Sequence, residues 1–531
     1  MIVSPEGASI PSPAVSKIVT WRRPGLGGVL VVAAGCLLLV LAADRIVRGV
    51  AAILRPVEAM YGEAIIYDQA ARLVRAEALY QALDRSPFTV TAYTPLYYTL
   101  VAGLQALAGP GFGPGRVLSF GAGLVAAILV GRLAARRVND WRAGLFAGVL
   151  FLGLGFPGDF PWFAFYKEDM LGVALSLGVI AMLDGGSDRR RAAGAGVWAG
   201  LAFLTKQTFV AASVAGFWWL WCRNRGSAVV FAAAILIVGV GPCVVAALSD
   251  HAFLDNTVRA NLNPYRTDIL ISNLTVLGRY QGVALALAIL PALSGARQMR
   301  RWPRDPLVVF WIASLVALPL GLAKVGSNWN YWIEAAAATA VLATRGVWLL
   351  VLHAGLPRLG RIAASVALLA VLPSPFWLPA PAADLGTVLH GTLHPDERQA
   401  TQFAAVLARV RAEPRLVLAE PLDIVTLAGR EILLEPYVFS ILDHEGQWNA
   451  MPVVRQICTG QIGLLVLDHP LEGPDWETHG YNHWPVAVLA ALRATMQLER
   501  RQASLFLYVP MSSPGAPLQN DVPPEACRGV T

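Results

Sequence analysis

A series of apolar stretches, most of them long enough to approach the thickness of a bilayer, is the feature that most restricts the fold of this chain. A membrane-spanning helix needs about 20 apolar residues, and roughly eleven stretches come near that length. Hydrophobic residues make up 56% of the 531 residues and charged residues only 15%, whereas a soluble domain carries about 25% charge. We therefore predict a mainly helical, polytopic membrane protein. The stretches lie near residues 28–45, 116–133, 143–157, 169–184, 193–205, 207–221, 228–248, 276–294, 307–323, 330–352 and 361–378.

The positive charges of the short loops predict the orientation of these helices. In membrane proteins, Lys and Arg are more frequent in cytoplasmic loops than in outer loops. If the N-terminus lies inside, the short inner loops of this chain hold about 19 Lys and Arg residues and the short outer loops hold roughly 6. This division requires that the short apolar run 94–108 does not cross the membrane. We predict that 94–108 is an outer juxtamembrane helix, with a transmembrane hairpin as the alternative. The net charge of +7 is thus explained by orientation, and no nucleic-acid partner is expected.

The chain is predicted to divide into a membrane domain and a smaller outer domain. From about residue 395, amphipathic helical patterns alternate with short apolar strands such as IGLLVLD, which is typical of an α/β fold. The predicted parts are a cytoplasmic segment 1–27, a transmembrane domain 28–378 with a first outer loop 46–115, an extracytoplasmic α/β domain 379–510 and a disordered tail 511–531. The first apolar run lacks a cleavage site and is interpreted as a retained helix.

The five cysteines show no metal-binding spacing. Only Cys458 and Cys527 could meet in a polar domain, and the sequence does not favour a disulfide between them.

Charged and amide side chains gather at the predicted outer ends of the apolar stretches, where each is a candidate for function. A carboxylate could act as general base towards an acceptor hydroxyl, while cations could hold a phosphate as it leaves. The apolar body could hold a lipid tail, so the pattern favours group transfer from a lipid phosphate. The side chains are Glu63 and Asp68, then Lys167, Glu168 and Asp169 in KEDM, Lys206 in LTKQTF, Arg259 and Arg266, and Lys324, Asn328, Asn330 and Glu334 in KVGSNWNYWIE.

Several segments resemble membrane glycosyltransferases of the GT-C class, specifically the family 39-like group related to protein O-mannosyltransferases and aminoarabinose transferases. They are YGEAIIYDQAARLVRAEALY with YTPLYYTLVAGL, FAFYKEDMLGVALSLGVIAML, AGLAFLTKQTFVAA and GSNWNYWIEAAAA. The segments LAGREILLEPYVFSIL, GQWN and IGLLVLD resemble the outer domain of bacterial members, so the resemblance covers roughly residues 28–510. Gly62-Glu63 and Thr94-Pro95 stand where the family often has Asp-Glu and Pro-Pro.

The resemblance implies an enzyme of the bacterial inner membrane that transfers a sugar from a polyprenyl-phosphate donor, with inversion, to a lipid, glycan or protein acceptor on the outer face. Glu63 matches the usual base, Asp169 matches the acid of the second outer loop, and Lys206 matches a contact to the lipid phosphate. No cofactor is implied with certainty, and a divalent metal is left open. The resulting candidate residues are Glu63, Asp68 and Asp169 for catalysis, Lys206, Arg259 and Lys167 for the donor phosphate, and Tyr93, Tyr97, Asn328, Asn330 and Glu334 for substrate binding.

Structural explanations compete with these roles. Glu63 and Asp68 would lie roughly 140° apart on one helix, so both cannot face one site. Asp169 could be a helix N-terminal charge, and Lys206 could extend to lipid headgroups. A transporter or flippase of a lipid-linked or charged substrate is the alternative function, although such proteins place ionisable groups near the midplane. A non-catalytic assembly protein is a third hypothesis.

Overall fold

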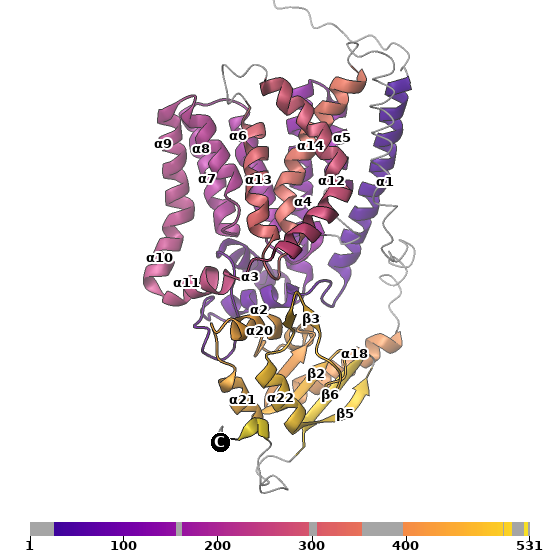
Figure 1. The fold of residues 1–531 in the computed structure, drawn as a ribbon, viewed down its shortest axis with the longest axis vertical. Coiled ribbons are helices and arrows are strands. Elements are labelled where there is room, and N and C mark those ends of the chain that lie inside the picture. Colours follow the sequence, from indigo (N-terminus) through magenta and orange to yellow (C-terminus); the bar gives the residue numbers. More distant parts are fainter. Residues whose placement is uncertain are drawn as a thin grey trace, which may run out of the picture.

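The computed structural model describes residues 26–154, 162–296, 305–352, 397–502, 504–511 and 525–528. The described chain is mainly helical, with a small sheet near its C-terminal end. Figure 1 shows long helices side by side in one body, with the sheet region beyond one end of them. The predicted span 361–378 and the predicted start of the outer domain at residue 379 lie outside the described residues.

Four helical segments are long and apolar enough to cross a membrane, and shorter apolar helices accompany them, so the predicted membrane character agrees with the structure. The predicted number of about eleven spans remains a prediction. The four segments are Gly113–Val138, Arg225–Ser249, Thr267–Leu293 and Trp329–Leu350. The helices of the body are α1 (Leu26–Leu54), α4 (Gly113–Val138), α5 (Trp141–Leu154), α6 (Asp169–Leu183), α7 (Arg189–Thr205), α8 (Ala211–Trp221), α9 (Arg225–Ile235), α10 (Gly241–Ser249), α11 (His251–Thr257), α12 (Thr267–Ala296), α13 (Pro306–Leu322) and α14 (Ile333–Val347). Short helical turns between or beside them are η1 (Trp162–Ala164), η2 (Leu236–Val240), η3 (Arg259–Asn261), η5 (Trp329–Trp332) and η6 (Trp348–Leu352).

Small residues let some of these helices approach closely. A Cβ atom on Gly131 of α4 would lie 2.8 Å from the carbonyl oxygen of Gly144 in α5, and the reverse distance is also 2.8 Å. Such contacts between backbones are typical of helices that pack in membranes, where close van der Waals contact replaces the hydrophobic effect as the driving force.

Two helices of the first outer loop, α2 (Glu63–Val74) and α3 (Leu96–Ala108), lie between the long helices and the sheet region (Figure 1). α3 has 13 residues, fewer than the roughly 20 that a bilayer core requires. Tyr67 of α2 packs against Phe112 and Tyr166 of the body, with ring centroids 5.3 and 6.1 Å away. The outer loop is therefore packed against the end of the helical body.

The sheet region contains a four-stranded mixed sheet in the order β1-β2-β6-β5. β1 and β2 are parallel, with Leu418 opposite Leu465, and β6 runs antiparallel to both of its neighbours. The strands are β1 (Leu416–Glu420), β2 (Ile462–Leu467), β5 (Met496–Gln502) and β6 (Leu505–Pro510), with a separate hairpin of β3 (Glu477–Thr478) and β4 (Tyr481–Asn482). The helices are α18 (Glu397–Ala412), α19 (Asp423–Leu427), α20 (Pro436–His444), α21 (Met451–Cys458), α22 (Val486–Thr495) and the turn η7 (Glu525–Cys527).

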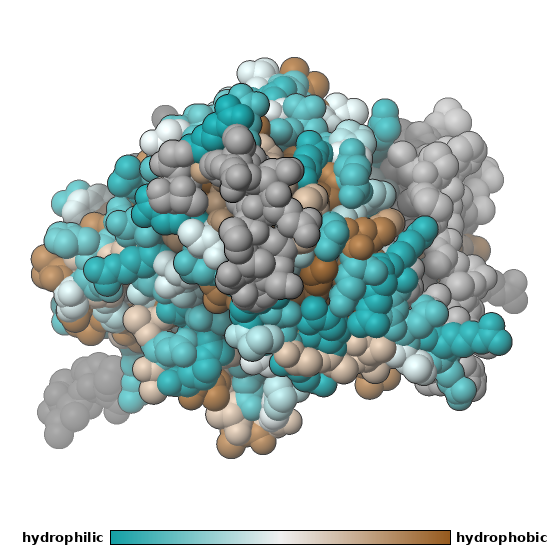
Figure 2. All heavy atoms as spheres, turned by 90° about the horizontal axis from the view of Figure 1, so that it is seen from below, coloured by the Kyte–Doolittle hydropathy of each residue, from teal (hydrophilic) through white to brown (hydrophobic). Residues whose placement is uncertain are grey.

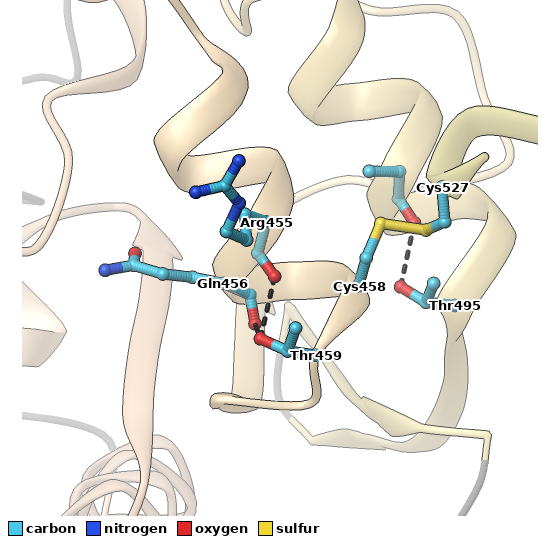
Figure 3. The surroundings of a disulfide bond; sticks show 7 residues. Arg455, Gln456, Cys458, Thr459, Thr495 and Cys527 are labelled. Atoms are coloured by element: carbon cyan, nitrogen blue, oxygen red, sulfur yellow. Dashed lines mark hydrogen bonds between the residues drawn. A yellow bond between two sulfur atoms is a disulfide. The ribbon is translucent and has the colours of Figure 1, made fainter. Parts of the chain in front are cut away.

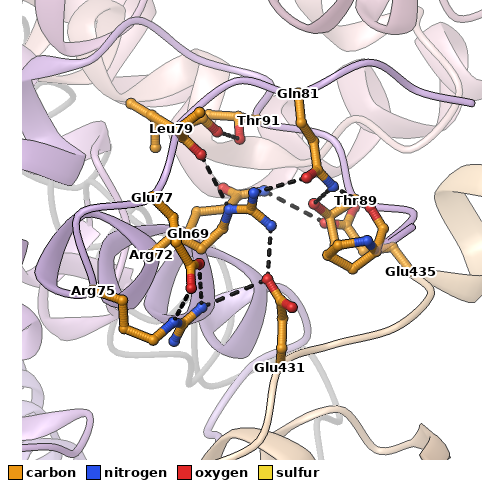
Figure 4. A network of polar contacts seen from close by, with 12 residues as sticks. Gln69, Arg72, Arg75, Glu77, Leu79, Gln81, Thr89, Thr91, Glu431 and Glu435 are labelled. Carbon is orange, nitrogen blue, oxygen red and sulfur yellow. Dashed lines mark hydrogen bonds and ion pairs between the residues drawn. The ribbon is translucent and has the colours of Figure 1, made fainter. Parts of the chain in front are cut away.

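A polar network joins α2 to the sheet region (Figure 4). Arg72 Nη1 lies 2.8 Å from Oε1 of Glu431, and its Nη2 donates to Gln81 at 2.7 Å. Gln69 Nε2 donates to the carbonyl of Val90 at 2.7 Å and to Glu435 Oε1 at 3.4 Å. Because Glu431 and Glu435 come from the sheet region, the first outer loop and that region are tied together by buried or half-buried polar side chains.

Cys458 and Cys527 form a disulfide that closes a separation of 69 residues (Figure 3). The sequence did not favour this bond. It ties the turn η7, which falls inside the tail predicted to be disordered, to the end of α21. Seen from the end that carries the sheet region, the surface is largely hydrophilic with scattered apolar side chains (Figure 2). Such a surface suits a region that stands in water.

Candidate active site

Lys206 lies at the centre of the candidate site and forms ion pairs with two consecutive carboxylates. Its Nζ lies 2.8 Å from Oε1 of Glu168 and 2.8 Å from Oδ1 of Asp169. All three side chains are buried. Asp169 begins α6 and Lys206 directly follows α7, so the ends of two neighbouring helices bring these charges together. One ammonium against two carboxylates gives the site negative charge in excess when both are ionised.

Asp169 accepts two further hydrogen bonds, which fix its orientation. Asn330 Nδ2 donates to Oδ1 at 3.0 Å, and Trp162 Nε1 donates to Oδ2 at 3.3 Å. The segments KEDM and GSNWNYWIE, which lie far apart in the sequence, therefore meet at one carboxylate. This contact confirms that Asn330 and Asp169 lie together, although their roles stay predictions.

Two aromatic rings enclose the ammonium of Lys206. Its Nζ lies 4.4 Å from the ring centroid of Tyr93 and 5.3 Å from that of Tyr331. An ammonium over an aromatic face is stabilised by the ring quadrupole, most strongly where water is excluded. The position of Lys206 is thus fixed on several sides, and its side chain does not extend to the lipid headgroups.

Glu168 is the carboxylate of this group with a free acceptor atom. Its Oε2 is buried and has no hydrogen-bond partner among the described residues, and the same holds for Oδ1 of Asn330. Burial raises the pKa of Glu168 above its ordinary value, although the neighbouring Lys206 acts in the opposite direction. Unpaired buried acceptors are costly, so these two oxygens are suited to hydroxyl groups of a ligand.

Glu63, the first candidate for the base, is held in a fully buried ion pair. Arg116 Nε and Nη2 donate to its two carboxylate oxygens at 2.9 and 2.6 Å. The backbone N–H groups of Tyr166, Ala59 and Met60 donate to the same carboxylate at 2.6, 2.7 and 3.3 Å. These five hydrogen bonds occupy most of the lone pairs of the Glu63 carboxylate, so it has little capacity to accept a proton from a substrate. This geometry favours a structural role for Glu63.

Arg116 also ties the end of α1 to this ion pair. Its Nη1 donates to the carbonyls of Ala52 and Arg55, both at 2.7 Å, and its Nη2 donates to that of Val57 at 2.9 Å. The pair of Glu63 and Arg116 therefore joins α1, α2, α4 and the loop before KEDM.

Asp68 faces away from Glu63, as the helical spacing predicts. It is buried towards the sheet region, where the backbone N–H of Ile432 reaches it. Burial, and then the charge of Glu431, raises the pKa of Asp68 to about 7. The structure thus separates the two carboxylates of α2 and places only Glu63 on the side of KEDM.

The candidate cations differ in whether a carboxylate already forms an ion pair with them. Among the described residues, Lys167 and Lys324 form no ion pair. Lys324 donates to Oδ1 of Asn261 at 3.3 Å, and burial, together with the nearby charge of Lys206, lowers its pKa to about 8. Arg259 is not buried with the group, because its side chain is 60% exposed and lies 4.0 Å from Asp255.

The backbone conformation explains why glycine occupies position 62. Gly62 has a φ of 93°, and a Cβ atom there would lie 2.6 Å from Nζ of Lys167. An acid at this position, as is frequent in the resembled family, would require a left-handed backbone that only glycine adopts readily, and the flexible end of Lys167 would have to move aside.

The remaining predicted residues have structural contacts. Tyr97 is buried and its hydroxyl lies 2.9 Å from that of Ser119. Asn328 caps η5 by accepting from the N–H of Trp329 at 2.7 Å. Glu334, in the first turn of α14, has an oxygen without a partner in the described structure.

Comparison with solved structures identifies the fold. The crystal structure of ArnT, an aminoarabinose transferase from Cupriavidus metallidurans, bound to undecaprenyl phosphate matches with a TM-score of 0.57 at 16% identity, over 92% of this chain and 100% of ArnT. The oligosaccharyltransferase of Archaeoglobus fulgidus in its apo form matches with a TM-score of 0.50 at 14% identity, over 85% of this chain and 70% of that protein. The chain has a GT-C glycosyltransferase fold. No family model and no curated protein matches the sequence.

This GT-C fold confirms the resemblance at the level of architecture, whereas activity must be argued from the site. Sequence reasoning missed Arg116, which is the first residue of the apolar stretch 116–133, and it gave no role to Glu168, Tyr331 or Lys324. An arginine at the predicted outer edge of an apolar stretch was the available signal for the first of these. Within the described part of the chain, no group of three or more His, Cys, Asp or Glu residues could hold a metal ion.

Proposed function

We propose that this protein transfers a sugar from a polyprenyl-phosphate donor to an acceptor hydroxyl at the extracytoplasmic membrane face. The observation that carries the proposal is the buried group of Glu168, Asp169 and Lys206 at the end of an apolar helical body. A donor of this kind needs apolar surroundings for its tail, cations for its phosphate and a carboxylate beside its anomeric carbon. The GT-C fold supports the proposal, as does the presence of undecaprenyl phosphate in the ArnT structure.

The proposed reaction is a single displacement. The acceptor oxygen forms a bond to the anomeric carbon, the bond from that carbon to the phosphate oxygen breaks, and the phosphate leaves with the electron pair. The hydroxyl proton passes to a carboxylate, and the configuration inverts. We assign the proton to Oε2 of Glu168, because that atom is free, while Asp169 holds Lys206 and Asn330 in place.

Glu63 and Asp68 then have supporting roles. Glu63 is saturated by five donors and positions the loop before KEDM. Asp68 is turned towards the sheet region and supports contact between the two parts.

The leaving phosphate is assigned to Lys324 and Lys167. The charge of Lys206 is already balanced by two carboxylates, and a balanced cation attracts a phosphate less than an unpaired one. Lys324 lies close enough to Lys206 for its pKa to be lowered by that charge, and Lys167 directly precedes Glu168. Arg259, which is exposed, is assigned at most a contact with the outer part of the donor.

The outer position of the site is supported by two features. The short loops predicted to lie inside carry most of the Lys and Arg residues. The disulfide between Cys458 and Cys527 belongs to the sheet region, and disulfides persist in oxidising compartments such as the bacterial periplasm. Both agree with a multi-pass protein of the bacterial inner membrane whose sheet region is extracytoplasmic.

The test uses the full chain, purified in detergent and offered a panel of radiolabelled polyprenyl-phosphate sugars with membrane lipids and glycans as acceptors. Glu168→Gln should lower the transfer rate by about 10²- to 10⁴-fold, the usual contribution of a general base. The matched control is Asp268→Asn, an exposed outer acid paired with Arg266, which should leave the rate unchanged. Full transfer by both Glu168→Gln and Asp169→Asn would refute the assignment.

A further inference from the structure

The carboxyl ends of the two parallel strands face the helical body. β1 ends at Glu420, and Asp423 follows it at the start of α19. Oδ2 of Asp423 accepts from the backbone N–H of Glu58, in the first outer loop, at 2.9 Å. In open α/β sheets, ligands bind in the crevice outside the carboxyl ends of the strands. In this chain that edge lies next to the membrane body.

A histidine and a carboxylate with an open acceptor occupy this edge. Nδ1 of His483 lies 2.8 Å from Oε1 of Glu420, and its Nε2 lies 3.0 Å from the hydroxyl of Thr478. Glu420 is only 7% exposed, yet its Oε2 has no hydrogen-bond partner among the described residues. A buried, unpaired carboxylate oxygen is a site for a donor hydroxyl from a ligand.

An exposed aromatic face stands beside this pair. Trp476 is 53% exposed, and its ring is stacked on His469 with centroids 5.2 Å apart and planes 24° apart. The same ring lies edge-on to His483 at 5.9 Å. His469 is itself oriented by Asp468 at 2.8 Å, directly after β2. One face of the indole is thus supported from behind.

The group borders the loop that carries Lys324. Tyr437 lies 5.0 Å from His483, ring centroid to ring centroid. It also packs in one apolar cluster with Val325, the neighbour of Lys324. A ligand resting on these rings would therefore border the loop that carries a proposed phosphate contact.

We propose that Trp476, His469, His483 and Glu420 form a binding site for a saccharide ring at the carboxyl edge of the sheet. A sugar ring has an apolar face of C–H groups, which suits a flat indole, and hydroxyls at its edge, which suit a histidine and a carboxylate. Aromatic walls with a few placed polar groups are typical of small-ligand sites. A cavity of about 490 Å³, lined in part by Glu472, Asp475 and Arg493, lies beside the same loop. The inference rests on the proposed function only for the source of the ring, which is either the acceptor or the donor sugar.

Binding is tested first, without any need for transfer. Saturation-transfer NMR on the full-length protein in detergent would use methyl glycosides of a pentose, a hexose and an N-acetylhexosamine at millimolar concentration. We expect a signal from at least one probe that falls at least fivefold in Trp476→Ala and in His469→Ala. Trp141→Ala is the matched control, because Trp141 is an exposed indole of the helical body that should leave binding unchanged. No signal from any probe, or equal signals in all variants, would overturn the proposal.

The source of the ring is tested by kinetics. If the ring belongs to the acceptor, Trp476→Ala raises KM for the acceptor about tenfold and leaves donor KM and kcat within twofold. If it belongs to the donor, the donor KM changes instead. If Trp476→Ala changed neither the acceptor KM nor the donor KM, the proposed binding site would be refuted, whereas the proposed transferase activity would stand. Conversely, binding by a protein without transfer would refute the proposed function and leave this site standing.

Discussion

Arg116 of α4 forms a bidentate, fully buried ion pair with Glu63 of α2, with Nη2 2.6 Å from Oε2. Removing one partner of a buried pair leaves an uncompensated charge, at a cost of about 3–5 kcal/mol. We therefore expect Arg116→Met to lower the free energy of unfolding by roughly that amount, measured by thermal and denaturant unfolding in detergent. Arg259→Met is the control, because that side chain is 60% exposed and should change little. Equal stability of Arg116→Met and the unsubstituted protein would contradict the structural role.

Buried carboxyls between α2 and the sheet region make stability depend on pH. Burial raises the pKa of Asp68 to about 7 and, with Asp423, that of Glu58 to about 8. The folded state thus holds these protons more tightly than the unfolded state does. The free energy of unfolding is therefore greatest below the unfolded pKa near 4, and it falls as the pH rises from there through the folded pKa values of about 7 to 8.

We expect the melting temperature to fall between pH 5 and pH 8, and Asp68→Asn to reduce that slope. Each pH unit between the two pKa values of a group is worth about 1.4 kcal/mol. Glu77→Gln, at an exposed ion pair with Arg75, should keep the slope of the unsubstituted protein. An unchanged slope in Asp68→Asn would show that this carboxyl does not titrate in the expected range.

Lys324 should make donor binding depend on pH. Its pKa is lowered to about 8 by burial and by Lys206, so it is charged below that pH and loses its charge above it. Donor KM should therefore rise as pH increases from 7 to 9. Lys324→Met should raise donor KM by roughly tenfold or more at pH 7, the loss expected for one charged hydrogen bond. Lys324→Arg should retain binding and remove the rise. A donor KM in Lys324→Met equal to that of the unsubstituted protein would exclude this lysine as a phosphate contact.

The disulfide should stabilise the sheet region by closing a long loop. Cys458 and Cys527 are separated by 69 residues, and loss of such a bond costs about 2–5 kcal/mol. Cys458→Ser should lower the unfolding temperature, as should reductant with the unsubstituted protein. Cys222→Ser, at a free exposed cysteine, should have no effect. If reductant left both the unfolding curve and the thiol count unchanged, the two cysteines would not be joined.

The mainly helical membrane architecture could be predicted from sequence because the length of an apolar stretch and the charge of a short loop are properties of neighbouring residues. The gathering of Asp169, Lys206 and Asn330 followed from assigning their loops to one side of the membrane, and their contacts at 2.8 and 3.0 Å agree with that assignment. The 140° separation of Glu63 and Asp68 on a helix likewise predicted that they face different ways.

What could not be predicted depended on partners far away in the sequence. The ion pair of Glu63 with Arg116, which lies 53 residues later, could not be predicted from either local segment. Glu168 and Asp169 are adjacent acids, and only the three donors on Asp169 distinguish them. The pairing of Cys458 with Cys527 required knowledge that η7 returns to α21, which no local pattern encodes.

The most direct test of the central claim is the initial rate of sugar transfer from a polyprenyl-phosphate donor by purified protein, compared between the unsubstituted chain and Glu168→Gln. Unfolding curves of both proteins establish that the variant is folded. We predict transfer with inverted configuration by the unsubstituted chain and a loss of about 10²-fold or more in the variant. Transfer at the same rate by both proteins, or none from any polyprenyl-phosphate sugar, would contradict it.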